Sequence, residues 1–147
     1  GDKRLKGDED RTGWPPATAG GLYSTLPDMY RFSQMLLNMG TFEGARVLGR
    51  KAVEAMTRNW LIEVPAFQWG AKLKWKSYGL GVDVRIGTHS RLGIKSPGTY
   101  SHEGAGRSAM YIDPVEQFMA LFLVPTAIDW VPESVINPQA IMWSGLD

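Results

Sequence analysis

Residues 100–124 read YSHEGAGRSAMYIDPVEQFMALFLV, and this stretch decides the fold. It holds two apolar runs, residues 107–112 and 117–124, separated by Asp113-Pro114-Val115-Glu116. Asp at the first position and Pro at the second position of a turn favour type I geometry. The stretch therefore predicts an antiparallel β-hairpin. Its second run is apolar enough that we expect a central strand of a sheet.

Another strand is predicted over residues 78–86, where every second residue is apolar. These residues are Tyr78, Leu80, Val82, Val84 and Ile86. A strict period of two is typical of a strand with one buried face. A polar, glycine-containing loop is expected from 87 to 98. Residues 71–76 alternate apolar residues with lysines, which favours a further strand with one solvated face.

A helix is predicted to begin after Thr25. The segment Thr25-Leu26-Pro27-Asp28 supplies a Thr N-cap, a Pro in the first turn and an acid at the capping-box position. Gly40 is expected to end the helix. The residues expected on its core face are Met29, Phe32, Met35, Leu36 and Met39.

A second helix is predicted over residues 50–59, with Ala52, Val53 and Met56 on its inner face. The tail, residues 131–143, is expected to be helical in part. Pro138 must start, kink or break that helix, because proline lacks a backbone N–H.

These elements predict an α+β fold in which helices flank an antiparallel sheet of about four or five strands. The 147 residues are enough for one domain with a sizeable core. We expect a single unit over 1–147, and it divides into a loop (1–17), a helical part (18–60), an aromatic loop (61–77), and a sheet with a C-terminal helix (78–147).

Composition excludes several classes of function. The 16 Lys and Arg nearly balance the 15 Asp and Glu, whereas a nucleic-acid-binding protein needs a basic excess. Cysteine is absent, which excludes disulfides, thiolate metal sites and cysteine nucleophiles. The only histidines, His89 and His102, lack metal-ligand spacing, and no phosphate-binding glycine loop occurs. We therefore expect no metal, no cofactor and no nucleic-acid partner. No apolar run approaches the roughly 20 residues that span a bilayer.

Four aromatic residues crowd the segment between the second helix and the strands: Trp60, Phe67, Trp69 and Trp75. They could form a cleft rim that stacks on a ligand. The interpretation we favour is ordinary aromatic packing beneath a long loop.

The segment Tyr100-Ser101-His102-Glu103-Gly104-Ala105-Gly106-Arg107 carries the candidate chemistry. Glycines at a strand edge let another backbone approach and can leave N–H groups free to stabilise an oxyanion. A histidine beside them can supply a proton or a positive charge. The same pattern also fits a β-bulge with a satisfied histidine, which this segment alone favours.

Five short segments, taken in their order along the chain, carry a resemblance to a known family. They are GGLYST (20–25), GARVL (44–48), YGLGV (78–82), HEGAG (102–106) and YIDP (111–114). In this order and spacing, residues 18–125 resemble the C-terminal half of the penicillin-recognising serine hydrolases. That superfamily includes class C β-lactamases, DD-peptidases and related esterases. The resemblance implies an incomplete β-lactamase/transpeptidase-like fold.

The resemblance also implies roles for individual residues. His102-Glu103-Gly104 matches the family's third active-site element, a Lys-Thr-Gly, His-x-Gly or Trp-x-Gly triplet on a cleft-lining strand. The N–H of Ala105 would then help to form the oxyanion hole, and His102 would orient the substrate or assist proton transfer. Glu103, Gly104 and Gly106 would contact the substrate.

Glu103 departs from the family, which has Thr or Gly at this position. A carboxylate facing the cleft would repel an anionic β-lactam or peptide, which favours esters or uncharged amides as substrates.

The family's other two elements, Ser-x-x-Lys and Tyr-x-Asn or Ser-x-Asn, do not occur in this sequence. In the family both precede the Gly-Gly-Leu segment. We therefore expect a fragment of a hydrolase that acts through an acyl-serine intermediate, with the chain alone inactive because a serine needs a positioned base. The missing half would leave an open sheet edge and an apolar patch, through which the chain could form a homodimer. The resemblance implies a periplasmic or secreted location.

Two alternatives remain open. The chain could be a related binding module that recognises cell-wall peptides or sugars through residues 60–75. It could also be an assembly module that binds a partner protein through the aromatic segment and the sheet edge.

Overall fold

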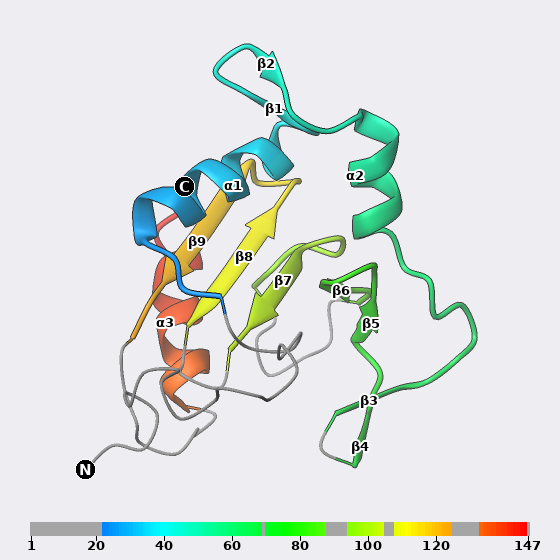
Figure 1. The fold of residues 1–147 in the computed structure, drawn as a ribbon. Helices are drawn as coiled ribbons and strands as arrows, with labels where there is room; N and C mark the ends of the chain where they lie inside the picture. The colour runs from blue at the N-terminus through cyan, green and yellow to red at the C-terminus, as the bar shows by residue number, and fades with distance from the viewer. Residues whose placement is uncertain (1–21, 69, 88–93, 105–107, 125–132, 147) are drawn as a thin grey trace, which may run out of the picture.

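The computed structural model describes residues 22–68, 70–87, 94–104, 108–124 and 133–146 (Figure 1). Its elements in chain order are α1 (Leu26–Leu37), β1 (Thr41–Phe42), β2 (Ala45–Arg46), α2 (Arg50–Thr57), β3 (Ala66–Gln68), β4 (Ala71–Leu73), β5 (Lys76–Tyr78), β6 (Asp83–Arg85), β7 (Tyr100–Glu103), β8 (Ala109–Asp113), β9 (Phe118–Phe122) and α3 (Glu133–Trp143). The predicted α+β class is confirmed.

The main sheet has five antiparallel strands in the order β5-β6-β7-β8-β9, so neighbours in the sheet are neighbours in the chain. The pairs β1-β2 and β3-β4 form separate two-stranded ribbons. Figure 1 shows α1 in front of β8 and β9, with α3 behind them. The sheet therefore has one apolar cluster on each face, and these two clusters position the candidate site.

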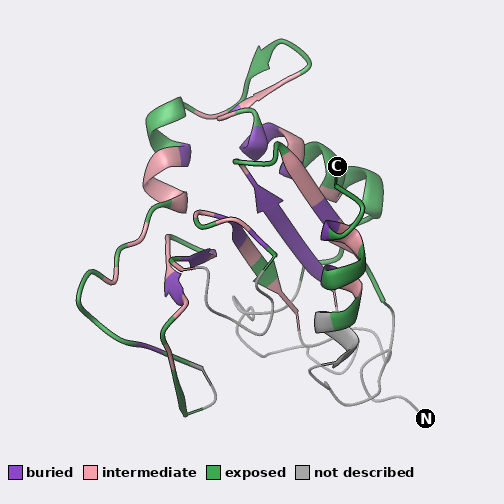
Figure 2. Ribbon diagram, turned by 180° about the vertical axis from the view of Figure 1, so that it is seen from behind, coloured by how far each residue is buried: buried purple, intermediate pink, exposed green. Residues whose placement is uncertain are grey.

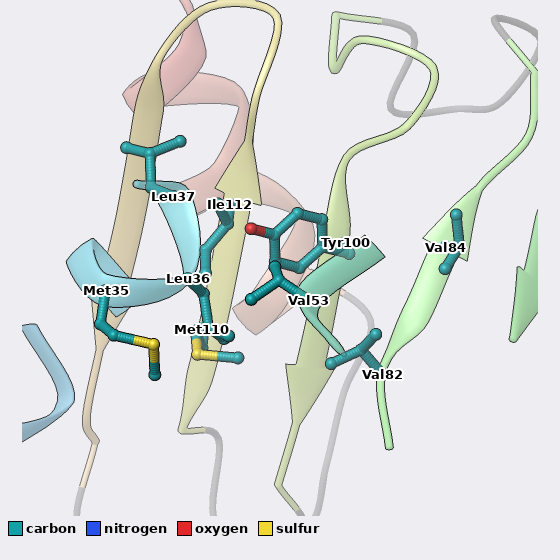
Figure 3. Close-up of a cluster of buried hydrophobic side chains, with 9 residues drawn as sticks. All are labelled: Met35, Leu36, Leu37, Val53, Val82, Val84, Tyr100, Met110 and Ile112. Atoms are coloured by element: carbon teal, nitrogen blue, oxygen red, sulfur yellow. The ribbon is translucent and has the colours of Figure 1, made fainter. Parts of the chain in front are cut away.

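The larger cluster lies between the sheet and the helices α1 and α2 (Figure 3). Its buried members are Met35, Leu36, Leu37, Val53, Val82, Val84, Tyr100, Met110 and Ile112. The second cluster lies beneath α3 and comprises Ala109, Tyr111, Ala120 and Trp143. Alternation along β8 explains the division, because successive residues of a strand point to opposite faces.

The predicted hairpin is confirmed as β8 and β9, joined at Asp113. The Oδ1 atom of Asp113 accepts the N–H groups of Val115 and Glu116, which closes the turn. Its Oδ2 atom accepts the N–H of Ser96 and the indole N–H of Trp143. One fully buried carboxylate thus joins the turn, a loop and α3.

The expectation of a central position for the second run is wrong for the described part of the sheet. β8 is the strand buried along its whole length (Figure 2), while β9 lies at the edge. Met119 and Leu121 pack toward α1, and Phe118 and Phe122 pack with α3. A strand covered by a helix on each face is apolar on both faces without having two strand neighbours.

The strand predicted over residues 78–86 is instead a hairpin. β5 ends at Tyr78 and β6 begins at Asp83. Gly79 N–H donates to the Val82 carbonyl at 2.8 Å, and Gly81 has a φ of +84°. A period of two continues through such a tight turn, so periodicity alone does not reveal the reversal.

The sequence also predicts one strand across residues 71–76, but β4 and β5 are separate. Lys76 is buried rather than solvated. Its ammonium group pairs with Asp83 across the β5–β6 hairpin at 2.6 Å, and this pairing accounts for a buried lysine at a position where alternation predicts solvent.

Helix α1 begins as predicted, since the backbone N–H of Asp28 donates to the Thr25 hydroxyl oxygen at 3.3 Å. The helix ends at Leu37, and Gly40 then closes its end by donating to the Met35 carbonyl at 2.8 Å. The expected core position of Phe32 is wrong, because this side chain is 43% exposed.

Helix α2 ends at Thr57, two residues earlier than predicted. Val53 is fully buried, whereas Ala52 is exposed. Pro138 lies inside α3, which continues to Trp143. The Trp143 ring makes edge contacts with Tyr111 and Phe118, at centroid distances of 5.9 and 5.0 Å, and so fixes the end of α3 on the sheet.

Within the described residues β9 pairs with β8 alone. Beside it an open apolar groove of about 340 Å³ runs between β9 and the start of α1. It is lined by Leu26, Pro27, Tyr30, Met119 and Leu121. No helix in the described ranges is long and apolar enough to cross a membrane.

Candidate active-site strand

His102 lies on β7, opposite Met110 of β8 in the strand register. Tyr100, two residues earlier, is buried in the cluster beneath α1 and α2. Alternation places His102 on the same face of the sheet as Tyr100, but the His102 side chain is exposed. The expected strand around His102 is therefore present, and its histidine reaches solvent on the α1/α2 face.

Gly104 follows β7 directly, and its N–H donates to the Ser108 carbonyl at 2.8 Å. A Cβ atom built at Gly104 would meet the nearest atom, the Ser108 carbonyl oxygen, at 3.7 Å. That is an ordinary contact, so local packing within the described residues does not require glycine here. The predicted oxyanion donor Ala105 and the predicted contact Gly106 lie outside the described residues.

Glu103 lies on the opposite face from His102. Its carboxylate accepts a hydrogen bond of 2.6 Å from the Tyr111 hydroxyl, beneath α3. The carboxylate thus faces away from the His102 side of the sheet. The repulsion of anionic substrates expected from Glu103 does not apply on that side.

The Tyr111 hydroxyl continues into a buried hydrogen-bonded chain. It accepts from the side-chain amide of Gln139 on α3 at 2.5 Å. The amide oxygen of Gln139 accepts from the ammonium group of Lys95, which also lies 4.5 Å from the centre of the Tyr111 ring. These hydrogen bonds thus connect β7, β8, α3 and the loop before β7.

Burial is the main cause of the pKa shifts in this group of hydrogen-bonded side chains. Burial raises the pKa of Tyr111 far above its usual value, and the neighbouring Glu103 carboxylate raises it further. The hydroxyl therefore stays protonated and donates to Glu103. Burial lowers the pKa of Lys95 to about 8, against an opposing effect of Glu103.

More charges lie on the same face around a small cavity of about 50 Å³. Its lining is Trp75, Lys76, Asp83, Val84, Arg85, Lys95, Thr99, Ser101 and Glu103. Burial raises the pKa of Asp83 despite its pairing with Lys76, and burial lowers the pKa of Arg85 despite the nearby Asp113 carboxylate. Among the residues with described positions, no group of three or more His, Asp or Glu could hold a metal ion.

The aromatic residues predicted to lie together are found in different parts of the structure. Trp60 is 43% exposed, with its indole N–H bonded to the Ala55 carbonyl and the Arg58 guanidinium 3.5 Å from the ring centre. Trp75 lines the cavity on the α3 face, and Phe67 is exposed on β3. Trp69 lies outside the described residues.

Sequence reasoning did not single out Tyr111, Gln139 or Lys95. A tyrosine in the middle of an apolar strand is a signal for a buried hydroxyl that needs a partner. Lys95 and Gln139 gave no such signal, since each lies in a segment whose polarity is ordinary for a loop or a helix.

Comparison with known proteins identifies the family of this chain. Residues 1–129 match the family described as Beta-lactamase. Protein Rv1367c of Mycobacterium tuberculosis (strain ATCC 25618 / H37Rv) is 33% identical over 119 residues, and so is protein MT1414 of strain CDC 1551 / Oshkosh. The match covers 75% of this chain and 30% of each relative, so the chain spans less than a third of their length.

Two solved structures share the fold. One is a protein from Bacillus anthracis assigned as a 6-aminohexanoate-dimer hydrolase, with a TM-score of 0.57, 23% identity, and coverage of 84% of this chain and 28% of the other. The second is a penicillin-binding protein homolog from Caulobacter crescentus, with a TM-score of 0.58, 20% identity, and coverage of 82% and 32%. The architecture thus agrees with the family match, and the chain belongs to the beta-lactamase family.

Proposed function

We propose that this chain is the C-terminal portion of a serine hydrolase that cleaves an ester or amide through an acyl-serine intermediate. The observation that carries the proposal is the placement of His102. It is exposed on the α1/α2 face of β7, next to Glu103 and two residues before Gly104, the glycine that follows the strand. The family match supports the same class of chemistry.

In this proposal His102 orients the substrate carbonyl or assists proton transfer, since an imidazole can donate or accept a proton. The N–H of Ala105, just past Gly104, donates to the developing oxyanion. Gly104, Gly106 and the main chain of Glu103 contact the substrate. The nucleophile and its base come from Ser-x-x-Lys and Tyr-x-Asn segments of a longer protein, because this sequence contains neither.

The substrate class we propose is a small ester, amide or peptide. The Glu103 carboxylate is bonded to Tyr111 on the α3 face, so its charge gives no reason to exclude anionic substrates. We also propose a periplasmic or secreted location, which rests on the resemblance to exported family members.

The edge of β9 and the groove beside it support a proposal about assembly. Leu26 and Tyr30 are 48% and 46% exposed there, next to half-buried β9 residues. Exposed apolar surface beside a strand edge that lacks a partner is prone to association. We propose that isolated chains form a homodimer through this edge, which sedimentation equilibrium tests. A monomer at all concentrations would contradict it.

Active-site labelling tests the hydrolase proposal. A fluorophosphonate or a fluorescent penicillin should not label the 147-residue chain stoichiometrically, and should label one serine of a protein extended to the length of the relatives. In the extended protein, His102→Ala should slow labelling about 100-fold, while His89→Ala serves as the matched control. Stoichiometric labelling of the 147-residue chain would contradict the absence of a nucleophile. An extended protein that stays unlabelled but binds cell-wall peptide or sugar would favour the binding-module alternative.

A further inference from the structure

The end of β7 has a strand neighbour on one side only. β8 pairs with β7 from Tyr100 to Glu103. β6 pairs with β7 only as far as Ser101. His102 and Glu103 therefore extend beyond Asp83, the first residue of β6. Among the described strands, their main chain pairs with β8 alone. A half-paired strand end has more conformational freedom than a fully paired one.

Side-chain bonds on the α3 face compensate for the missing strand pairing. Glu103 is bonded to Tyr111, and Tyr111 is bonded to Gln139. Tyr111 is 0% exposed and Gln139 is 1% exposed, so neither side chain can exchange these bonds for water without opening the α3 face. The bonds therefore connect Glu103 to β8 and α3.

Lys95 supplies the charge that a partly buried carboxylate requires. Its ammonium group bonds to Gln139, and its field acts on Glu103. The other charged groups on this face are Lys76, Asp83 and Arg85 around the same cavity. Lys76 and Asp83 form an ion pair with each other, and hydrogen bonds through Gln139 and Tyr111 connect Lys95 to Glu103.

We infer that Glu103 is a positioning residue, which acts from the α3 face of β7 to hold the strand end that presents His102 and Gly104 on the other side. Its carboxylate is the first member of the Glu103–Tyr111–Gln139–Lys95 chain. Its effect on catalysis rests on the hydrolase function proposed above. Its effect on the conformation of the strand is independent of that function.

Amide hydrogen exchange on the 147-residue chain tests the effect on the strand. The Gly104 N–H is bonded to the Ser108 carbonyl and reports on the strand end, and the Ile112 N–H of fully buried β8 serves as the internal reference. Tyr111→Phe and Glu103→Thr should raise the Gly104 exchange rate about tenfold relative to Ile112, as expected for the loss of one buried hydrogen bond. General destabilisation would raise both rates together. Tyr100→Phe, which removes a hydroxyl from a buried tyrosine of the same strand on the opposite face, should leave the ratio unchanged.

A second measurement does not depend on stability. Glu103→Gln keeps an oxygen that can accept from Tyr111 but removes the charge, so the Gly104 ratio should rise less than in Glu103→Thr. The NMR titration midpoint of the Lys95 side chain should fall in Glu103→Gln, since Glu103 supports the charged form of Lys95. An unchanged Gly104 ratio in Tyr111→Phe, or an unchanged Lys95 midpoint in Glu103→Gln, would overturn the inference. A missing acyl-serine in the extended protein would contradict the hydrolase proposal alone, because both measurements here use the 147-residue chain.

Discussion

Asp113 gives the sharpest prediction about stability. Its carboxylate is fully buried and accepts hydrogen bonds from Ser96, Val115, Glu116 and the Trp143 indole. In Asp113→Asn, one oxygen can still close the turn, but an NH2 group replaces Oδ2, which is the acceptor for both Ser96 and Trp143. Two donors, the buried indole N–H of Trp143 and the half-buried N–H of Ser96, then face another donor. At about 1–3 kcal/mol for a buried group left without a partner, and less for a half-buried one, we expect a loss of about 2–4 kcal/mol.

The same carboxylate predicts a pH dependence. Burial alone would raise its pKa, but the N–H donors of Ser96, Trp143 and Glu116 outweigh burial and lower the pKa below its usual value. A depressed pKa in the folded state stabilises the fold above the unfolded pKa of about 3.9, and this stability is lost as the pH falls through the folded value. The unfolding free energy of the wild type should therefore fall below about pH 4, and less steeply in Asp113→Asn.

Urea unfolding followed by circular dichroism at pH 7 and across the acid range measures both effects. Asp28→Asn is the matched control, because Asp28 is an exposed carboxylate at the start of α1, and it should change stability by less than about 1 kcal/mol. An Asp113→Asn variant within about 0.5 kcal/mol of the wild type, with the same acid dependence, would refute this account of the turn.

Further predictions concern packing and charge. Gly79→Ala should destabilise the fold by about 3 kcal/mol, because the new Cβ would lie 2.1 Å from the Met56 carbonyl oxygen. Gly81 has a φ of +84° and open space around it, so Gly81→Ala should lose only about 1–2 kcal/mol. Equal urea midpoints for the two variants would contradict the close approach of Gly79 to Met56. Val53→Ala should lose about 2–3 kcal/mol, since Val53 is fully buried between α2 and the sheet, and a loss below about 1 kcal/mol would show that the cluster is loosely packed. Lys95 has a folded pKa of about 8, below its unfolded value, so its neutral form favours folding and the unfolding free energy should rise between pH 8 and about 10. Lys95→Met should flatten that rise, and an unchanged slope would exclude Lys95 as its source.

Much of the fold could be predicted because local signals agreed with tertiary packing. The Thr25 cap and the Asp113 turn each depend on hydrogen bonds within a few residues, so the sequence was sufficient to place them. Residues 78–86 show the opposite case, where a period of two continued through the β5–β6 turn. The Gly79–Val82 hydrogen bond and the left-handed Gly81 close the turn, and Gly79 also lies close to Met56, a contact that the alternation does not reveal.

The candidate site divides in the same way. The strand that bears His102 was predictable from the segment, and the His102 side chain is exposed on the α1/α2 face. The direction of Glu103 was not predictable, because it depends on Tyr111 from the next strand and on Gln139 from a distant helix. The triplet resemblance alone suggested a cleft-facing carboxylate.

The proposed oxyanion donor lies in the main chain just past Gly104. The direct measurement is a crystal structure of the extended protein after reaction with a fluorophosphonate. We expect the phosphonyl oxygen within about 2.7–3.1 Å of the Ala105 backbone nitrogen, with the His102 imidazole facing the same adduct. An adduct whose oxygen contacts neither group, or which lies on the α3 face beside Lys95, would contradict the account.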